Sequence, residues 1–469
     1  MTGPDARRSP DAGAAGGHGA AGGAGASMAS GGAGATPAAS GYTATLAAAA
    51  ITCALAPAYT VRWHYGPLPT TLLETAILVT VGVFLIETWR HRSRIEWRTP
   101  LTMPAVIFLL AGALAVLTAP NRWAAAGLYR AYLIEPMALF LVLATITRTA
   151  RRALIVVLGL MAGGVALAIP NIVTVIQAIG DHTLDLSGTP PVAIYQTQNA
   201  VALFLLPLIG LAASLLLYGR MHERLVGASF LAIAVPAFVL TLSRGGYLAL
   251  GAVLLGLALT HRYRLWLVAA AAAAGAIFTR VPAIAIRIEH DLNFSDPANT
   301  LVGRVPLWKA TLQLLRDHPV FGAGLSGFET RLAPYWNATH ADRFIYPHNL
   351  LLNFWVATGV LGVLAFAWIL VFAFRQSWRQ WRRGERDWAP FQLGVFLALV
   401  GIVVHGLVDV PYFKNDLSME FFVLLAISWA GARWGSLAGL AGGGDRLRVA
   451  EVTAQDQLAE HPDRPVAPA

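Results

Sequence analysis

The chain has 469 residues, of which 56% are hydrophobic and 13% are charged, and its mean hydropathy is +0.59. Soluble globular proteins carry about 25% charged residues, so this composition predicts an integral membrane protein. The net charge of +9 does not indicate nucleic-acid binding because the basic residues form short clusters between apolar segments, and the single cysteine, Cys53, excludes an internal disulfide and a thiolate metal cluster.

The two ends of the chain lack the apolar residues that a packed core needs. Residues 1–41 are rich in Gly, Ala, Ser and Pro, and residues 438–469 are largely polar. Both are predicted to be disordered tails. Between them lie about twelve apolar segments, each near the ~20 residues that cross a bilayer as a helix. Their approximate bounds are 43–60, 68–87, 101–118, 124–147, 153–178, 198–218, 225–242, 245–260, 265–279, 349–374, 390–408 and 418–436.

Basic residues alternate between the connections of these segments. Sixteen arginines fall in one set of connections and four Arg or Lys residues in the other, apart from the long connection 280–347. Because short basic connections stay in the cytoplasm, both tails are predicted to be cytoplasmic and residues 280–347 to face outward. The expected fold is an all-α membrane protein, with helices one to nine in 42–279 and helices ten to twelve in 348–437.

The outward loop 280–347 is the only long extramembrane stretch expected between helices. In residues 307–315 the apolar side chains share one arc of a helix, with Lys309, Gln313 and Arg316 on the opposite arc. This pattern predicts an amphipathic helix lying on the membrane or over the bundle, although packing alone would also explain it. His318-Pro319 would end the helix, and the glycines that follow would allow tight turns. We therefore expect the loop to form a lid over an outward-facing membrane cavity.

Ionisable residues from distant parts of the chain are predicted to converge on the outer face. Such groups are costly in a membrane and commonly line a cavity or a site. Each also has a structural alternative: an arginine can pair with a carboxylate, anchor at the interface or be a surface charge, Asp409 can cap a turn, and a histidine can start a helix or be satisfied in the core. The converging residues are Arg130 with Glu135, Arg244, Arg304, His348, His405 and Asp409.

These residue types suit transfer from a lipid-diphosphate donor. Clustered guanidinium groups bind phosphates through charge-assisted hydrogen bonds. A neutral histidine can accept the proton of an attacking hydroxyl. The short outward connections carry no acidic pair, so no metal or other cofactor is expected, and arginines would stabilise the leaving diphosphate instead. The sequence also has no P-loop and no GxSxG pattern.

Several short motifs, in this order and topology, resemble the Wzy_C or O-antigen ligase superfamily. They are Ser243-Arg244-Gly245 after an apolar helix, Gly303-Arg304 followed by Trp308, His318-Pro319 with Gly322 and Gly324, and His348-Asn349 before Gly359. The resemblance covers residues 45–435 in layout, with its specific motifs in 195–360. It implies a GT-C-like, metal-independent, inverting glycosyltransferase. Such enzymes use undecaprenyl-diphosphate-linked glycans at the outer face of the bacterial cytoplasmic membrane.

The resemblance also implies roles for individual residues. Arg244 and Arg304, with Arg130 as a third candidate, would bind the donor diphosphate, and His348 would be the catalytic base. Asp409, His405 and Asn349 would support them. The acceptor would be lipid A–core or another glycolipid or polysaccharide. Polymerase and protein O-oligosaccharyltransferase activities remain alternatives, as do a glycolipid transporter and a non-catalytic glycolipid-binding protein.

Overall fold

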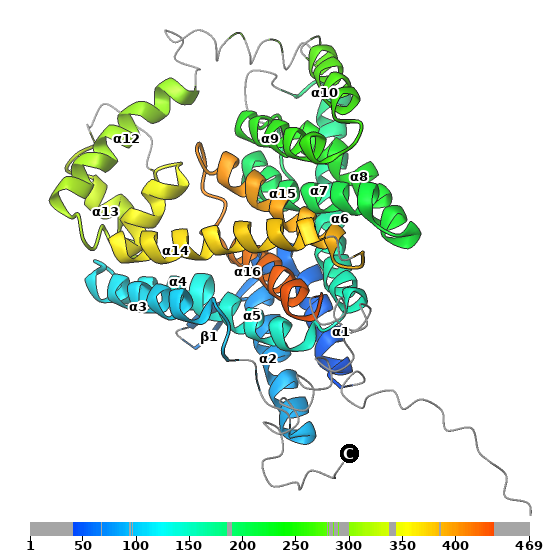
Figure 1. Ribbon diagram of the computed structural model, residues 1–469. Coiled ribbons are helices and arrows are strands. Elements are labelled where there is room, and N and C mark those ends of the chain that lie inside the picture. Colours follow the sequence, from blue (N-terminus) through cyan, green and yellow to red (C-terminus); the bar gives the residue numbers. More distant parts are fainter. Residues whose placement is uncertain are drawn as a thin grey trace, which may run out of the picture. The chain divides into compact units, whose positions relative to one another are not determined.

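A computed structural model describes residues 41–435, apart from 67, 93–94, 96, 185–189, 279, 281–284, 286–288, 290–299, 337–343 and 384–385. The described part is predominantly helical, with one small two-stranded sheet (Figure 1). The tails expected at 1–41 and 438–469 lie outside the described residues, except Gly41.

The helices follow the apolar segments of the sequence. In chain order, the elements are α1 (Thr43–Ala54), η2 (Ala56–Thr60), β1 (Arg62–Tyr65), β2 (Leu68–Thr71), α2 (Leu72–His91), α3 (Thr102–Thr118), α4 (Arg122–Tyr129), η3 (Arg130–Ile134), α5 (Glu135–Ile146), α6 (Ala150–Gly180), α7 (Gln198–Tyr218), α8 (Met221–Leu240), α9 (Arg244–Thr260), α10 (Arg264–Phe278), α12 (Thr300–Asp317), α13 (Phe328–Leu332), α14 (Leu350–Arg383), α15 (Ala389–His405), α16 (Asn415–Ala430) and η4 (Gly431–Gly435). Both η3 and η4 are π-helical turns, and η3 continues α4 directly into α5.

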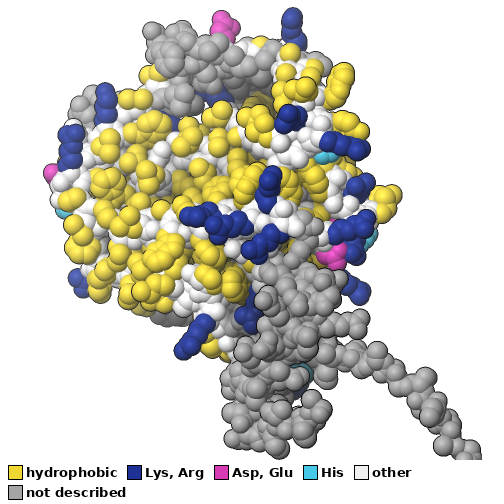
Figure 2. Space-filling model, in the orientation of Figure 1, with side chains coloured by type: hydrophobic (Ala, Val, Ile, Leu, Met, Phe, Trp, Pro, Cys, Tyr) yellow, Lys and Arg dark blue, Asp and Glu magenta, His cyan; other side chains and the backbone are white. Residues whose placement is uncertain are grey.

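Among the described residues, six helices are long and apolar enough to cross a membrane: α2, α4 with η3 and α5, α6, α7, α8 and α14. The apolar helices α1, α3, α9, α10 and α15 are shorter. The protein is therefore a mostly helical chain with several candidate membrane spans, whereas the count of twelve stays a prediction. Figure 2 shows a surface dominated by hydrophobic side chains, with Lys and Arg gathered toward its edges and in one band. That distribution suits a protein surrounded by lipid.

Helix α7 lies in the core of the described bundle. Its sequence is apolar on every side, which is typical of a helix with no solvent-facing surface, and it packs on α8, α9 and α15. Small residues bring α7 and α15 close together: a Cβ atom at Gly394 would lie 2.3 Å from Leu211 Cδ1. The close contact of these helices holds α15 in place, and α15 ends at His405, four residues before Asp409.

The second apolar segment begins differently from the prediction. A helix was expected from residue 68, but residues 68–71 form β2, which pairs antiparallel with β1. The turn between the strands includes Gly66 in the left-handed region, with φ +57°. Helix α2 then starts with a capping box, in which Thr71 Oγ1 accepts from Glu74 N and Glu74 accepts from Thr71 N. The β1–β2 hairpin is important below because it forms one wall of a cavity.

The predicted amphipathic helix lies within α12. Leu307, Ala310, Leu314 and Leu315 are buried as the pattern requires, whereas Leu312 is 44% exposed. The buried side chains pack with Phe328 and Leu332 of α13 and with Val356 of α14. Packing on the bundle therefore explains the apolar arc, and Figure 1 shows α12 and α13 at one end of α14.

A break in α14 receives the segment that follows α12. Gly359 has φ +68°, and the helix kinks there. The carbonyl of Val356 accepts bonds from the N–H groups of Ala323 and Gly324, and the N–H of Val360 donates to Val320 O. The segment therefore satisfies the backbone groups that the break releases, which a membrane-embedded helix requires. It is an integral part of the bundle.

Candidate functional site

The start of α9 shows why Ser243, Arg244 and the two glycines occur together. Ser243 Oγ accepts from Gly246 N at 3.2 Å and caps the helix. A Cβ atom at Gly245 would lie 2.7 Å from Val408 Cγ2 and 3.2 Å from His405 Cδ2, so a side chain here would require Val408 to shift. Arg244, the first residue of α9, is therefore held beside the connection that leaves α15.

The α15–α16 connection, residues 406–414, begins with a tight turn. The N–H groups of Val408 and Asp409 both donate to His405 O, and Asp409 Oδ1 accepts from Val410 N at 2.9 Å. His405 and Asp409 are 1% and 2% exposed. The turn therefore presents one buried histidine and one buried carboxylate next to α9.

His348 lies opposite that carboxylate. Its Nδ1 atom is 3.4 Å from Asp409 Oδ1, with side-chain exposures of 22% for the histidine and 4% for the aspartate. The distance is longer than a typical N–H···O hydrogen bond, so the two groups are neighbours that would form an ion pair only with a protonated histidine. His348 also has φ +49°, an uncommon conformation for a residue with a side chain. Such strained residues cluster at functional sites.

The electrostatic environment favours the ionised form of Asp409. Burial by itself would raise the pKa of this carboxyl group, but His348, His405 and Arg304 together hold the pKa below its ordinary value. The carboxylate can therefore orient and stabilise a protonated histidine beside it.

Aromatic side chains pack around His348. The ring centroids of Tyr346 and His348 are 4.5 Å apart, and Phe344 meets His348 edge-on at 5.7 Å. Burial and the charge of Asp409 raise the pKa of Tyr346, so its phenol stays protonated at neutral pH. Tyr346 is consequently unsuited to act as a base, whereas the imidazole of His348 is partly exposed.

Helix α12 is attached directly to the residue before His348. Trp308 Nε1 donates to Pro347 O at 2.9 Å. Arg304 lies one helical turn before Trp308, and its charge influences both Asp409 and Tyr346. The spacing of Arg304 and Trp308 in the sequence thus places a guanidinium near the His348–Asp409 pair.

Asn349 joins the two sides of the site. Its Oδ1 atom accepts from Leu352 N at 3.0 Å in the first turn of α14. Its Nδ2 group donates to Leu407 O at 2.9 Å, and Leu350 N donates to Gly406 O at 2.7 Å. The start of α14 is therefore fastened to the α15–α16 connection, which sets the separation of His348 and Asp409.

Arg130 lies in a different cluster. Its Nη2 atom donates to Glu74 Oε2 at 2.6 Å and to Pro69 O at 2.9 Å, and its Nε atom is 3.1 Å from Glu135 Oε1. Asn415 Nδ2 donates to the other Glu74 oxygen at 2.6 Å. Two carboxylates thus surround this guanidinium, and its predicted role as a third diphosphate ligand stays a prediction.

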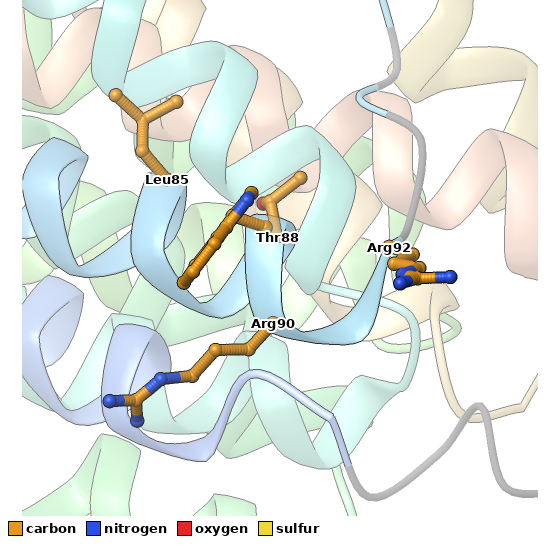
Figure 3. Close-up of a pocket in the computed structure, with 5 residues that line it drawn as sticks. Leu85, Thr88, Arg90 and Arg92 are labelled. Carbon is orange, nitrogen blue, oxygen red and sulfur yellow. The ribbon is translucent and has the colours of Figure 1, made fainter.

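Two of the pockets in the described part of the chain include arginines in their lining. One has a volume of about 730 Å³ and lies between the β1–β2 hairpin, α4 and Arg130. The other, about 690 Å³, lies at the end of α2 and is lined by Leu85, Thr88, Trp89, Arg90 and Arg92. Figure 3 shows the guanidinium groups of Arg90 and Arg92 pointing in different directions. That lining contains no histidine or carboxylate, so no general base is available there.

The structure thus brings together most of the residues predicted for the site. Arg304, His348, Asn349, His405 and Asp409 meet around the α15–α16 connection, and Arg244 lies at the adjacent start of α9. Sequence reasoning missed Trp308 and Tyr346 as neighbours of His348. It also gave Glu74 no role. For Trp308, the available signal was its position four residues after Arg304. The partners of Glu74 come from elements too distant in the sequence for any local pattern to indicate them.

The fold and these groups define a polytopic helical membrane protein with a polar site shared by four helix ends and the connections beside them. The family model described as O-Antigen ligase, Wzy_C, matches residues 228–367. This match, over about 30% of the chain, supports a relationship to the O-antigen ligase family, and that family suggests a glycosyltransferase-like enzyme. The match begins in α8 and ends in α14, and it includes Arg244, Arg304, His348 and Asn349. No curated protein matches the chain.

Proposed function

We propose that this protein transfers a glycan from a polyprenyl diphosphate, such as undecaprenyl diphosphate, to the hydroxyl group of a cell-surface acceptor. The reaction takes place at the outer face of the bacterial cytoplasmic membrane, with both chain termini in the cytoplasm. The observation that carries the proposal is the contact of 3.4 Å between His348 and Asp409 with Arg304 in electrostatic range. This set combines a base, a group that orients it and a cation for the leaving group.

His348 acts as the general base. Asp409 faces Nδ1, so the tautomer that carries its proton on Nδ1 is favoured and Nε2 is left as the acceptor. Nε2 takes the proton of the acceptor hydroxyl as that oxygen attacks the anomeric carbon. Asp409, which is 2% exposed, then stabilises the positive imidazolium.

The arginines act on the donor. As the new carbon–oxygen bond forms, the bond between the anomeric carbon and the diphosphate oxygen breaks, and its electron pair remains on the diphosphate. Arg244 and Arg304 bind that group and stabilise its increasing negative charge. Attack from the face opposite the leaving group inverts the anomeric centre. Because the arginines supply the positive charge, the transfer needs no divalent metal.

The related transferase activities differ in the acceptor that they use. A ligase joins a complete glycan to lipid A–core or another glycolipid, a polymerase joins repeat units, and an O-oligosaccharyltransferase modifies a protein. We favour the ligase, on the description of the matching family. These residues favour an enzyme over a transporter. A histidine general base beside an orienting carboxylate serves proton transfer, which the movement of a glycolipid does not require.

The proposal is tested with purified protein in proteoliposomes that contain a glycan-loaded polyprenyl diphosphate and candidate acceptors. The expected result is formation of a glycosylated acceptor together with release of the sugar-free carrier diphosphate. A single transferred block indicates a ligase, and a ladder of products indicates a polymerase. Transfer should also persist in excess EDTA. Movement of intact glycolipid across the bilayer without any transfer would refute the enzymatic proposal.

A further inference from the structure

The cavity at the β1–β2 hairpin has a rigid polar floor. Glu74, which is 4% exposed, accepts from Thr70 Oγ1 at 2.9 Å and from Thr71 N at 3.1 Å. Its two oxygens also accept from Arg130 and Asn415. One carboxylate thus joins the hairpin, the α4–α5 helix and the start of α16, so the walls of the cavity are held in fixed positions.

The walls combine aromatic faces with polar groups. Trp63 comes from β1, Trp123 from α4 and Tyr132 from η3, while Arg62, His64 and Asn121 supply polar atoms. Trp123 is 60% exposed although it lies beside a cavity. Aromatic rings offer apolar surfaces with little conformational freedom, and a few convergent polar groups give orientation. A pyranose ring, with its apolar C–H face and its hydroxyl edge, fits this combination.

The cavity is connected to the proposed reaction centre through one short segment. The α15–α16 connection carries Asp409 beside His348, and six residues later Asn415 binds Glu74 under the cavity. Six residues span at most about 20 Å. Between them, Tyr412 donates its hydroxyl hydrogen to Tyr132 O at 2.9 Å, so the connection also supports a wall of the cavity. A glycan of several sugars could therefore extend from His348 to the hairpin.

We propose that the cavity lined by Trp63, Trp123, Tyr132 and Arg130 is a glycan-binding subsite, which holds sugars beyond the one at the reaction centre. This inference rests on the proposed function for the identity of the ligand. Arg130, with its charge balanced by Glu74 and Glu135, contributes hydrogen bonds to sugar hydroxyls from its remaining N–H groups. The sugars can belong to the donor or to the acceptor, since both present the same chemistry.

The test measures binding of free glycans to the purified protein, separately from transfer. The two probes are the oligosaccharide released by mild acid from the host's lipid-linked donor and the oligosaccharide released from its surface acceptor. Neither carries a diphosphate. The His348→Ala variant should bind as the wild type does, whereas Trp123→Ala should bind about three- to tenfold more weakly, as expected for loss of one aromatic contact. The probe that is affected identifies the source of the sugars.

Trp97→Ala provides the matched control, because Trp97 is also 60% exposed but does not line the cavity. It should bind glycans like the wild type. In saturation-transfer NMR, irradiation of aromatic protein protons should give a signal on the bound sugar, and this signal should decrease in Trp63→Ala. Binding of both probes unchanged in folded Trp63→Ala and Trp123→Ala would overturn the subsite. If the subsite is correct but the proposed function is wrong, the Trp variants bind glycan more weakly as described, and the wild type transfers no glycan.

Discussion

The Nδ1 atom of His348 lies 3.4 Å from Oδ1 of Asp409, and the two residues reach this contact from opposite sides of a fastened junction. His348 precedes α14, and Asp409 follows α15. The side-chain amide of Asn349 donates to Leu407 O and the backbone N–H of Leu350 donates to Gly406 O, so the contact does not depend on the His348 and Asp409 side chains alone.

The lowered pKa of Asp409 gives a pH dependence with a defined sign. Its carboxylate contributes stability above the ordinary pKa of an aspartate, and that contribution is lost as pH falls through the lower pKa of the folded protein. Wild type should therefore be more stable than Asp409→Asn at pH 7, and the difference should shrink as the pH falls below about 4. Thermal unfolding in detergent between pH 7 and pH 3 measures it. A difference that grows on acidification would contradict this sign.

Trp308 is predicted to position His348 through the Pro347 carbonyl. Trp308→Phe keeps an aromatic but smaller side chain and removes the N–H donor, and loss of that hydrogen bond alone costs about 0.5–1.5 kcal/mol. The loss should appear mainly in kcat, with KM for the donor little changed, because Pro347 is adjacent to the base. Steady-state kinetics of transfer in proteoliposomes measure both quantities.

Trp355→Phe is the control for that variant. It loses an equivalent bond, from Trp355 Nε1 to Pro319 O, but that bond fastens the segment after α12 to α14. It should lower the unfolding temperature and leave kcat closer to the wild-type value. Equal losses of kcat in the two variants would argue against a specific positioning role for Trp308.

Gly359 should tolerate no side chain. It has φ +68°, and a Cβ atom would lie 2.3 Å from Val320 O. Gly359→Ala should destabilise the protein by at least about 1–3 kcal/mol, the cost of a strained backbone conformation. Gly251, in the interior of α9, has open space around it, so Gly251→Ala should be neutral or stabilising by up to about 1 kcal/mol. Denaturation in detergent compares the two, and similar effects would refute the account of the kink.

Glu74 should be more important for stability than a surface carboxylate. Glu74→Gln replaces an oxygen by an amide donor and leaves Arg130 only Glu135 as a charged partner, with an expected loss of about 1–3 kcal/mol. The Arg220–Asp387 pair is about half exposed on each side, so Asp387→Asn should cost less than about 1 kcal/mol. The unfolding midpoints of the two variants test whether Glu74→Gln destabilises the protein more than Asp387→Asn does. A larger loss of stability in Asp387→Asn would contradict this prediction.

Local sequence patterns singled out the short motifs around Arg244 and Arg304, and the structure shows what the neighbouring residues of those motifs do. Ser243 caps α9, Gly245 allows close approach, and Arg304 lies one turn from Trp308. The convergence of His348 and Asp409 followed from the alternation of basic connections, which places both at the outer ends of their segments. The structure places the two residues in contact, whereas their position at the outer face and their chemical roles stay predictions.

The location of Arg130 could not be predicted in this way. Its partner Glu74 belongs to the capping box of a helix that starts four residues later than hydropathy suggested, and a hairpin precedes that helix. Asn415, the other partner of Glu74, comes from the far end of the chain. Contacts of this kind depend on tertiary packing, and no periodicity in the sequence encodes them. The number of spans was also uncertain for a physical reason, since five of the apolar helices are shorter than a bilayer requires.

The central claim is that His348 removes the proton from the acceptor hydroxyl during glycan transfer. The most direct measurement is single-turnover transfer in proteoliposomes preloaded with the glycan-linked donor, comparing wild type with His348→Ala at matched donor occupancy. The account predicts that His348→Ala retains its fold and its donor but transfers the glycan about 10²- to 10⁴-fold more slowly. Transfer at the wild-type rate by folded, donor-bound His348→Ala would contradict it.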